Sequence, residues 1–153
     1  TFLRLGGALV ALSLIMALIA QFGFKLLPCD LCILQRYPAV LAVGFWLLAE
    51  ATGKWRLLLA LFLFTCLITA AIALYHTGVE QSWWPGPTHC SGDGASGAEL
   101  SLEALTAQIK AAPLIRCDKP AIEVMGITMA SANFMFSLVL AALAFVGLTR
   151  KES

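Results

Sequence analysis

The chain has 153 residues, of which 60% are hydrophobic and only 12% are charged. Its mean hydropathy is +0.88, and one soluble core of this size cannot hide so many apolar side chains from water. This composition excludes a disordered chain, a coiled coil and an ordinary cytosolic enzyme. The net charge of +1 provides no basic field for nucleic acid. A lipid bilayer is the solvent that such a surface requires.

Four apolar segments are long enough, or nearly so, to cross a bilayer as helices, which takes about 20 residues each. In chain order they cover residues 5–24, 33–49, 57–75 and 127–148. The second is the weakest, because Arg36 and Pro38 lie near its start. Three further spans follow the first, which favours a span there over a cleaved secretory signal. We predict an all-α membrane protein, a four-transmembrane-helix bundle that forms a single integral membrane domain over residues 1–153.

Two loops, residues 25–32 and 76–126, connect the spans on one side of the membrane. The longer loop contains the run Trp83-Trp84-Pro85-Gly86-Pro87 and then a Gly/Ser-rich run at 91–97, both typical of turns. Further along, Ser101 is a suitable N-cap, apolar residues recur at helical spacing, and Pro113 ends the segment. We expect a short amphipathic helix there, lying either in the membrane interface or on the rest of the loop.

Basic residues near the ends of the spans determine the orientation of a membrane protein. Five lie on the side that carries both termini, and five lie on the side of the two loops. The first five are crowded into very short segments, whereas three of the second five are spread over the long loop. We therefore predict that both termini are cytoplasmic and that the two loops lie on the opposite side.

Four of the five cysteines lie in these two loops, and the fifth, Cys66, lies in the third span. We expect Cys66 to be structural, because a buried cysteine behaves as a small hydrophobe. Cys29 and Cys32 form a Cys-x-x-Cys, and a helix beginning there would favour a thiolate. Arg36 follows Cys32 by four residues and shares its helical face. Its charge would favour Cys32 as the thiolate or polarise a ligand carbonyl, unless Arg36 serves only as an interfacial anchor.

Cys90 and Cys117 are 27 positions apart in the long loop. A purely structural disulfide between them would stabilise this loop by about 3 to 4 kcal/mol in the loop-closure picture. Alternatively, the pair exchanges with the Cys-x-x-Cys through a mixed disulfide, which the adjacent Gly/Ser-rich run favours. A zinc site that combines the cysteines with His76 or His89 is a third interpretation. It lacks the usual doubled Cys-x-x-Cys spacing.

Three features of the sequence resemble the bacterial disulfide bond formation protein B (DsbB) family. They are the run PCDLCILQR from Pro28 to Arg36, the run YHTGVEQ from Tyr75 to Gln81 before the Trp-Pro-Gly segment, and Cys117 about ten residues before the last span. The resemblance implies a multi-pass protein of the bacterial inner membrane, with its active cysteines facing the periplasm. Such proteins re-oxidise a periplasmic DsbA-like thiol oxidant and pass two electrons to ubiquinone or menaquinone, a known relay that keeps the periplasm oxidising.

The resemblance also implies roles for the four loop cysteines. Cys90 would form the mixed disulfide with the DsbA-like partner, and Cys117 would be its mate in the loop. Cys29 and Cys32 would be the pair beside the quinone, with Cys32 as the thiolate that contacts the quinone ring. No resident metal is expected.

Two further residues complete the predicted quinone site. Arg36 matches the quinone-binding arginine of the family, and His76 matches a histidine near the quinone head group, whereas Gln35 receives no role.

Two alternative functions stay open. One is a quinone/thiol oxidoreductase similar to vitamin K epoxide reductase, against which the order of the cysteine motifs argues. The other is a non-enzymatic four-span protein whose long loop is merely stapled.

Overall fold

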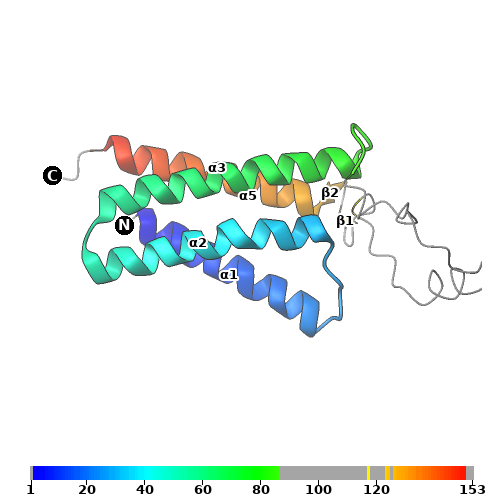
Figure 1. Ribbon diagram of the computed structural model, residues 1–153, viewed down its shortest axis with the longest axis horizontal. Helices are drawn as coiled ribbons and strands as arrows, with labels where there is room; N and C mark the ends of the chain where they lie inside the picture. The colour runs from blue at the N-terminus through cyan, green and yellow to red at the C-terminus, as the bar shows by residue number, and fades with distance from the viewer. Residues whose placement is uncertain (1, 87–116, 118–122, 125, 151–153) are drawn as a thin grey trace, which may run out of the picture.

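The computed structural model describes residues 2–86, 117, 123–124 and 126–150. Its helices are α1 (Phe2–Phe22), α2 (Asp30–Thr52), α3 (Trp55–Glu80) and α5 (Met129–Thr149). All four are long and apolar enough to cross a membrane, which confirms the predicted all-α, four-helix membrane fold. The start of α1, the α2–α3 turn and the end of α5 lie at one end of the bundle (Figure 1). The predicted amphipathic helix of the long loop lies outside the described residues.

Two helices extend further than apolarity alone predicts. Helix α2 begins at Asp30 rather than near residue 33, so Cys32 lies in its first turn instead of in a loop. Helix α3 continues to Glu80 rather than ending near residue 75, which places His76 inside the helix. The difference arises because hydropathy marks only the lipid-facing part of a helix and misses polar turns that face the bundle interior. Both extensions put predicted loop residues on a rigid framework.

A short hairpin precedes α5, and the sequence alone did not predict it. Strand β1 (Glu123–Val124) pairs antiparallel with β2 (Ile127–Thr128), and Gly126 between them has φ 81°. Glycine adopts this left-handed conformation without steric cost. The Thr128 side chain then accepts the N–H of Ser131 at 3.2 Å, while the Ser131 hydroxyl accepts the N–H of Thr128 at 2.9 Å. This reciprocal capping box fixes where α5 begins.

Helix α3 is the centre of the bundle: it contacts α5 and α2 most extensively, while α1 lies mainly against α2. An apolar core fills the space between the helices, and Phe62 at its centre is 1% exposed. The outward faces are apolar as well, since Leu12, Phe64 and Phe145 are all more than half exposed. Helices that are hydrophobic all round are typical of membrane spans. The bundle therefore needs lipid around it and supports a polar site at one end.

Candidate active site

Cys29 and Cys32 lie together where α2 begins. Cys29 is the N-cap residue, and its Sγ accepts the backbone N–H of Cys32 at 3.3 Å. The two Sγ atoms are 2.8 Å apart, and both cysteines are free thiols. Cys29 is buried and Cys32 is half-buried. Since the N-terminus of a helix directs unpaired N–H groups and partial positive charge outward, this position favours a negatively charged sulfur.

The surroundings of Cys29 stabilise its thiolate. The hydrogen bond with the Cys32 side chain makes the largest contribution to a pKa of Cys29 that is lowered to about 4, and His76 makes a smaller one. Burial opposes both, because it disfavours a charged sulfur. These contacts favour negative charge on Cys29 in the reduced pair, while the thiolate role that the sequence assigns to Cys32 through Arg36 stays a prediction. The Arg36 guanidinium donates from Nη1 to Gln21 Oε1 at 2.6 Å.

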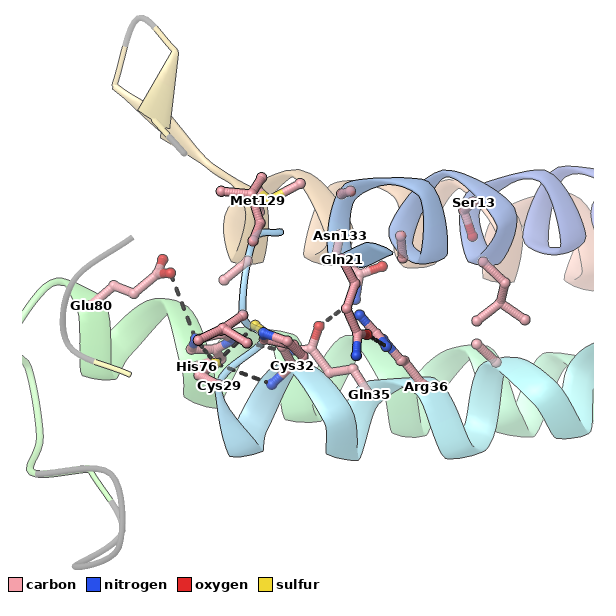
Figure 2. A pocket seen from close by; sticks show the side chains of 18 of the residues that line it. Ser13, Gln21, Cys29, Cys32, Gln35, Arg36, His76, Glu80, Met129 and Asn133 are labelled. Carbon is pink, nitrogen blue, oxygen red and sulfur yellow. Dashed lines mark hydrogen bonds and ion pairs between the residues drawn. The ribbon is translucent and has the colours of Figure 1, made fainter. Parts of the chain in front are cut away.

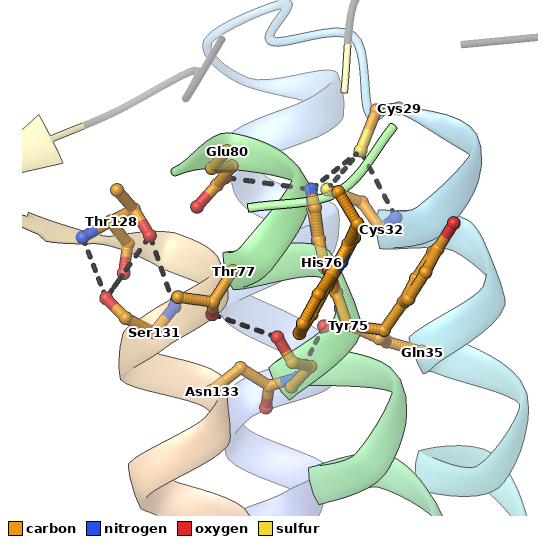
Figure 3. A network of polar contacts seen from close by, with 12 residues as sticks. Cys29, Cys32, Gln35, Tyr75, His76, Thr77, Glu80, Thr128, Ser131 and Asn133 are labelled. Carbon is orange, nitrogen blue, oxygen red and sulfur yellow. Dashed lines mark hydrogen bonds and ion pairs between the residues drawn. The ribbon is translucent and has the colours of Figure 1, made fainter. Parts of the chain in front are cut away.

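His76 joins the cysteine pair to a buried polar network (Figure 3). Its Nε2 lies 3.5 Å from Cys29 Sγ, and its Nδ1 lies 3.1 Å from Gln35 Nε2. From α5, Asn133 donates its Nδ2–H to Gln35 Oε1 at 2.6 Å. This bond turns the amide N–H of Gln35 toward Nδ1, so Nδ1 accepts and the ring proton sits on Nε2. The network therefore holds one tautomer of His76, with its N–H on the side of Cys29.

Glu80, one helical turn after His76, is a further member that the sequence alone did not single out. Its Oε1 lies 3.6 Å from His76 Nε2, and its side chain is only 4% exposed. Its Oε2 is buried and has no hydrogen-bond partner among the described residues. Gln35 and Asn133 were likewise without a predicted role. The polarity of these side chains could have indicated the site, because polar residues in or beside membrane spans usually mark a functional site.

A cavity of about 670 Å³ opens beside the cysteine pair, and all four helices contribute to its wall (Figure 2). Apolar side chains form much of this wall. The polar or titratable residues that line it are Ser13, Gln21, Lys25, Cys29, Cys32, Gln35, Arg36, His76, Glu80 and Asn133. The volume falls in the range of roughly 300 to 1,000 Å³ that is usual for small-molecule sites. The cavity suits an apolar ligand that presents a few polar atoms at one end.

The cysteine of the long loop that the structure describes lies beside this site. Cys117 is 1% exposed and belongs to one buried cluster with Cys29, Leu31 and Val79, against which Cys32 packs. It is disulfide-bonded, while Cys90 and His89 lie outside the described residues. The predicted pairing of Cys90 with Cys117 stays a prediction.

The remaining cysteine is remote from this chemistry. Cys66 is buried on α3 within the apolar core that the four helices share. Its neighbours there are hydrophobic side chains, so it fills space like any small apolar residue. Of the four cysteines that the structure describes, three therefore gather at one end of the bundle.

The same groups satisfy the first requirement of a metal centre. Ligand atoms of Cys29, Cys32 and His76 all lie within 4.8 Å of one another. Zinc sites that perform chemistry often have three protein ligands and an open position. The geometry alone therefore permits both a dithiol and a metal interpretation of this end of the bundle.

The comparison with known proteins decides the family. Residues 1–147 match the family described as disulfide bond formation protein DsbB. The chain belongs to the DsbB family. A relative, the uncharacterized protein RP370 of Rickettsia prowazekii (strain Madrid E), is 31% identical over 144 residues, which cover 92% of this chain and 80% of the relative. No solved structure matches the chain.

Membership of the DsbB family confirms the resemblance read from the cysteine motifs. It makes the protein a multi-pass membrane protein of disulfide bond formation with disulfide oxidoreductase activity. It also favours the dithiol interpretation of Cys29 and Cys32 over the metal interpretation.

Proposed function

We propose that the protein re-oxidises a periplasmic DsbA-like dithiol oxidant and passes the two electrons to a membrane quinone, either ubiquinone or menaquinone. The single observation that carries this proposal is the cavity, whose wall contains both cysteines of the Cys-x-x-Cys together with Arg36 and His76. A quinone is an uncharged apolar ring with two carbonyl oxygens, and it supplies a two-electron sink when bound. The apolar wall fits the ring, and the N–H groups of the arginine fit an oxygen.

Thiol–disulfide exchange connects the soluble partner to this cavity. In the proposed cycle, the reduced partner attacks the disulfide of Cys90 and Cys117, and the resulting dithiol then reduces a disulfide of Cys29 and Cys32. The burial of Cys117 in one cluster with Cys29 supports this second exchange. Cys29, Cys32 and Cys66 are free thiols, which supports Cys90 as the mate that we assign to Cys117.

Within the pair beside the cavity, the two sulfurs take different roles. We assign Cys32 to the contact with the quinone ring and Arg36 to one of its carbonyl oxygens. The half-buried side chain of Cys32 lines the cavity. Cys29 is more deeply buried, and its Sγ accepts the backbone N–H of Cys32 in the first turn of α2. Its stabilised thiolate would keep the reduced pair ready to give up electrons.

We also propose that the cysteine end of the bundle faces the periplasm and that both termini are cytoplasmic, in a bacterial inner membrane. The opposite end carries a concentration of basic residues, namely Arg4, Lys54, Arg56 and Arg150. Such residues are enriched on the cytoplasmic side of membrane proteins. Labelling of Cys32 and Cys90 from opposite compartments would contradict the proposed orientation and the electron path together.

The decisive experiment follows partner oxidation by the purified protein with added ubiquinone or menaquinone, while the redox state of every cysteine is trapped. We expect Cys90→Ser to abolish oxidation of the partner and Arg36→Ala to weaken the use of quinone. Arg56→Ala is a matched control, because that guanidinium donates to the carbonyl oxygen of Leu148 at the other end of the bundle.

Three outcomes would overturn the proposal. Unchanged quinone dependence in Arg36→Ala would leave Arg36 as an interfacial anchor. Cysteine pairs that remain oxidised whatever quinone or partner is added would favour a stapled, non-enzymatic protein. Stoichiometric zinc in the purified protein would favour the metal site.

A further inference from the structure

We propose that Glu80 is the proton carrier of this site: its carboxyl group takes up one proton when the Cys29–Cys32 disulfide is reduced and releases it when the pair is re-oxidised. This inference rests on the proposed function and deepens it. Glu80 lines the same cavity as both cysteines, and among the described residues in that wall it is the only one with a carboxyl group.

The first argument is the unpaired oxygen. Native proteins leave few buried polar atoms without a hydrogen-bond partner, and each such atom calls for an explanation. The side chain of Glu80 is only 4% exposed, and its Oε2 has no hydrogen bond among the described residues. Pairing with His76 involves only Oε1, at 3.6 Å, so it does not explain why Oε2 is buried without a partner. An oxygen without a partner has room for a transferable proton.

The second argument is that His76 has no vacant position for that proton. Its Nδ1 accepts from the Gln35 amide, whose orientation is fixed by Asn133. Its Nε2 therefore carries the ring proton, 3.5 Å from Cys29 Sγ and 3.6 Å from Glu80 Oε1. A second ring proton would sit on Nδ1, where it would face the N–H of the Gln35 amide, and two donors cannot form a hydrogen bond with each other. The Nε2–H of His76 thus lies between the sulfur and the carboxylate.

The other charged groups in the wall cannot do this work. Lys25 and Arg36 are cations with no acceptor, and Arg36 is already bonded to Gln21. Of the two sulfurs, Cys29 is the one held as a thiolate by the start of α2 and by His76. The reduced pair therefore keeps one proton on Cys32, and a second proton needs a place elsewhere.

The balance of the step follows from these assignments. Before re-oxidation the site holds the Cys29 thiolate, the Cys32 thiol and a protonated Glu80. Two electrons leave the sulfurs as the disulfide bond forms, and two protons leave with them, one from Cys32 and one from Glu80. A quinone that receives both electrons and both protons becomes the quinol, and Glu80 returns to a carboxylate. The net charge is −1 on both sides of this step.

The test compares Glu80→Gln, which keeps the shape but cannot carry a proton, with Glu123→Gln, which changes an exposed acid in β1. The first readout needs no quinone: infrared difference spectra of the quinone-free protein are recorded as the cysteine pair is reduced. We expect a protonated-carboxyl band to grow on reduction in the wild type and in Glu123→Gln and to be missing in Glu80→Gln. A band of equal size in Glu80→Gln would overturn the proposal.

The second readout is turnover. General acid–base groups contribute about 10²- to 10⁴-fold to a rate, so Glu80→Gln should form quinol at least about 100-fold more slowly. The far-ultraviolet circular dichroism spectrum of Glu80→Gln should match that of the wild type, which shows that the variant is folded. Quinol formation within a few-fold of wild type would refute the role of Glu80. A wild-type protein that reduces no quinone would instead refute the proposed function, and the infrared experiment would still decide the role of Glu80.

Discussion

Replacing Cys32 with alanine is expected to raise the pKa of Cys29. The Cys32 side chain makes the largest contribution to the low pKa of about 4, and alanine has no group that can donate. A hydrogen bond to a charged group contributes about 1.5 to 3 kcal/mol, and one pKa unit corresponds to about 1.36 kcal/mol. The pKa of Cys29 should therefore rise to about 5 or 6. It should stay below the usual value, because the contacts from the Cys32 backbone N–H and from His76 remain.

The assay is an acid-to-alkaline titration of the fully reduced protein, in which the ultraviolet absorbance of the thiolate is recorded. Cys32→Ser is the matched control, since its hydroxyl keeps a donor in place and the pKa of Cys29 should stay near that of the wild type. Cys29→Ser identifies the signal, because the acidic transition should disappear. The reasoning is refuted if Cys32→Ala titrates like the wild type, or if the transition survives in Cys29→Ser.

Three other outcomes test the structure. The pKa of Cys29 is lower in the folded protein than its ordinary value of 9.0, so the free energy of unfolding of the reduced protein should fall as the pH decreases from about 9 to about 4; Cys29→Ser should flatten this dependence. Gly78→Ala should lower Tm by destabilising the fold about 1 to 3 kcal/mol, because a Cβ there would clash with the Trp84 ring. Gly44→Ala is its control, with nothing within 4 Å of the added Cβ. Asn133→Leu leaves a buried amide oxygen without its donor and should reduce the free energy of unfolding by about 1 to 3 kcal/mol in chemical denaturation.

Much of the fold could be predicted from the sequence because lipid imposes a simple requirement. A span needs about 20 apolar residues, and the four apolar segments met that requirement without any knowledge of how the helices pack. The Cys-x-x-Cys at the start of a helix could be predicted for a similar reason. The helix N-terminus and the spacing of Cys29 and Cys32 are both local properties of the chain.

The polar network could not be predicted, because its contacts depend on how distant helices dock. Gln35 and Asn133 are 98 positions apart, and nothing in either segment specifies the other. Whether Glu80 belongs to the site depends on how far α3 continues. The apolar segment ends near residue 75, whereas the helix extends to Glu80. The thiolate was assigned to Cys32 because Arg36 follows it by one helical turn. In the structure the decisive neighbours of Cys29 are the Cys32 side chain and His76.

One sulfur atom belongs to the Cys-x-x-Cys and also caps a helix. Cys29 Sγ accepts the backbone N–H of Cys32 in the first turn of α2, and an anionic acceptor holds such a donor more strongly than a neutral one. Forming a disulfide would remove that charge and weaken this hydrogen bond, so the first turn of α2 should be less stable when Cys29 is oxidised. The stability of this helix start therefore depends on the charge of a single sulfur atom.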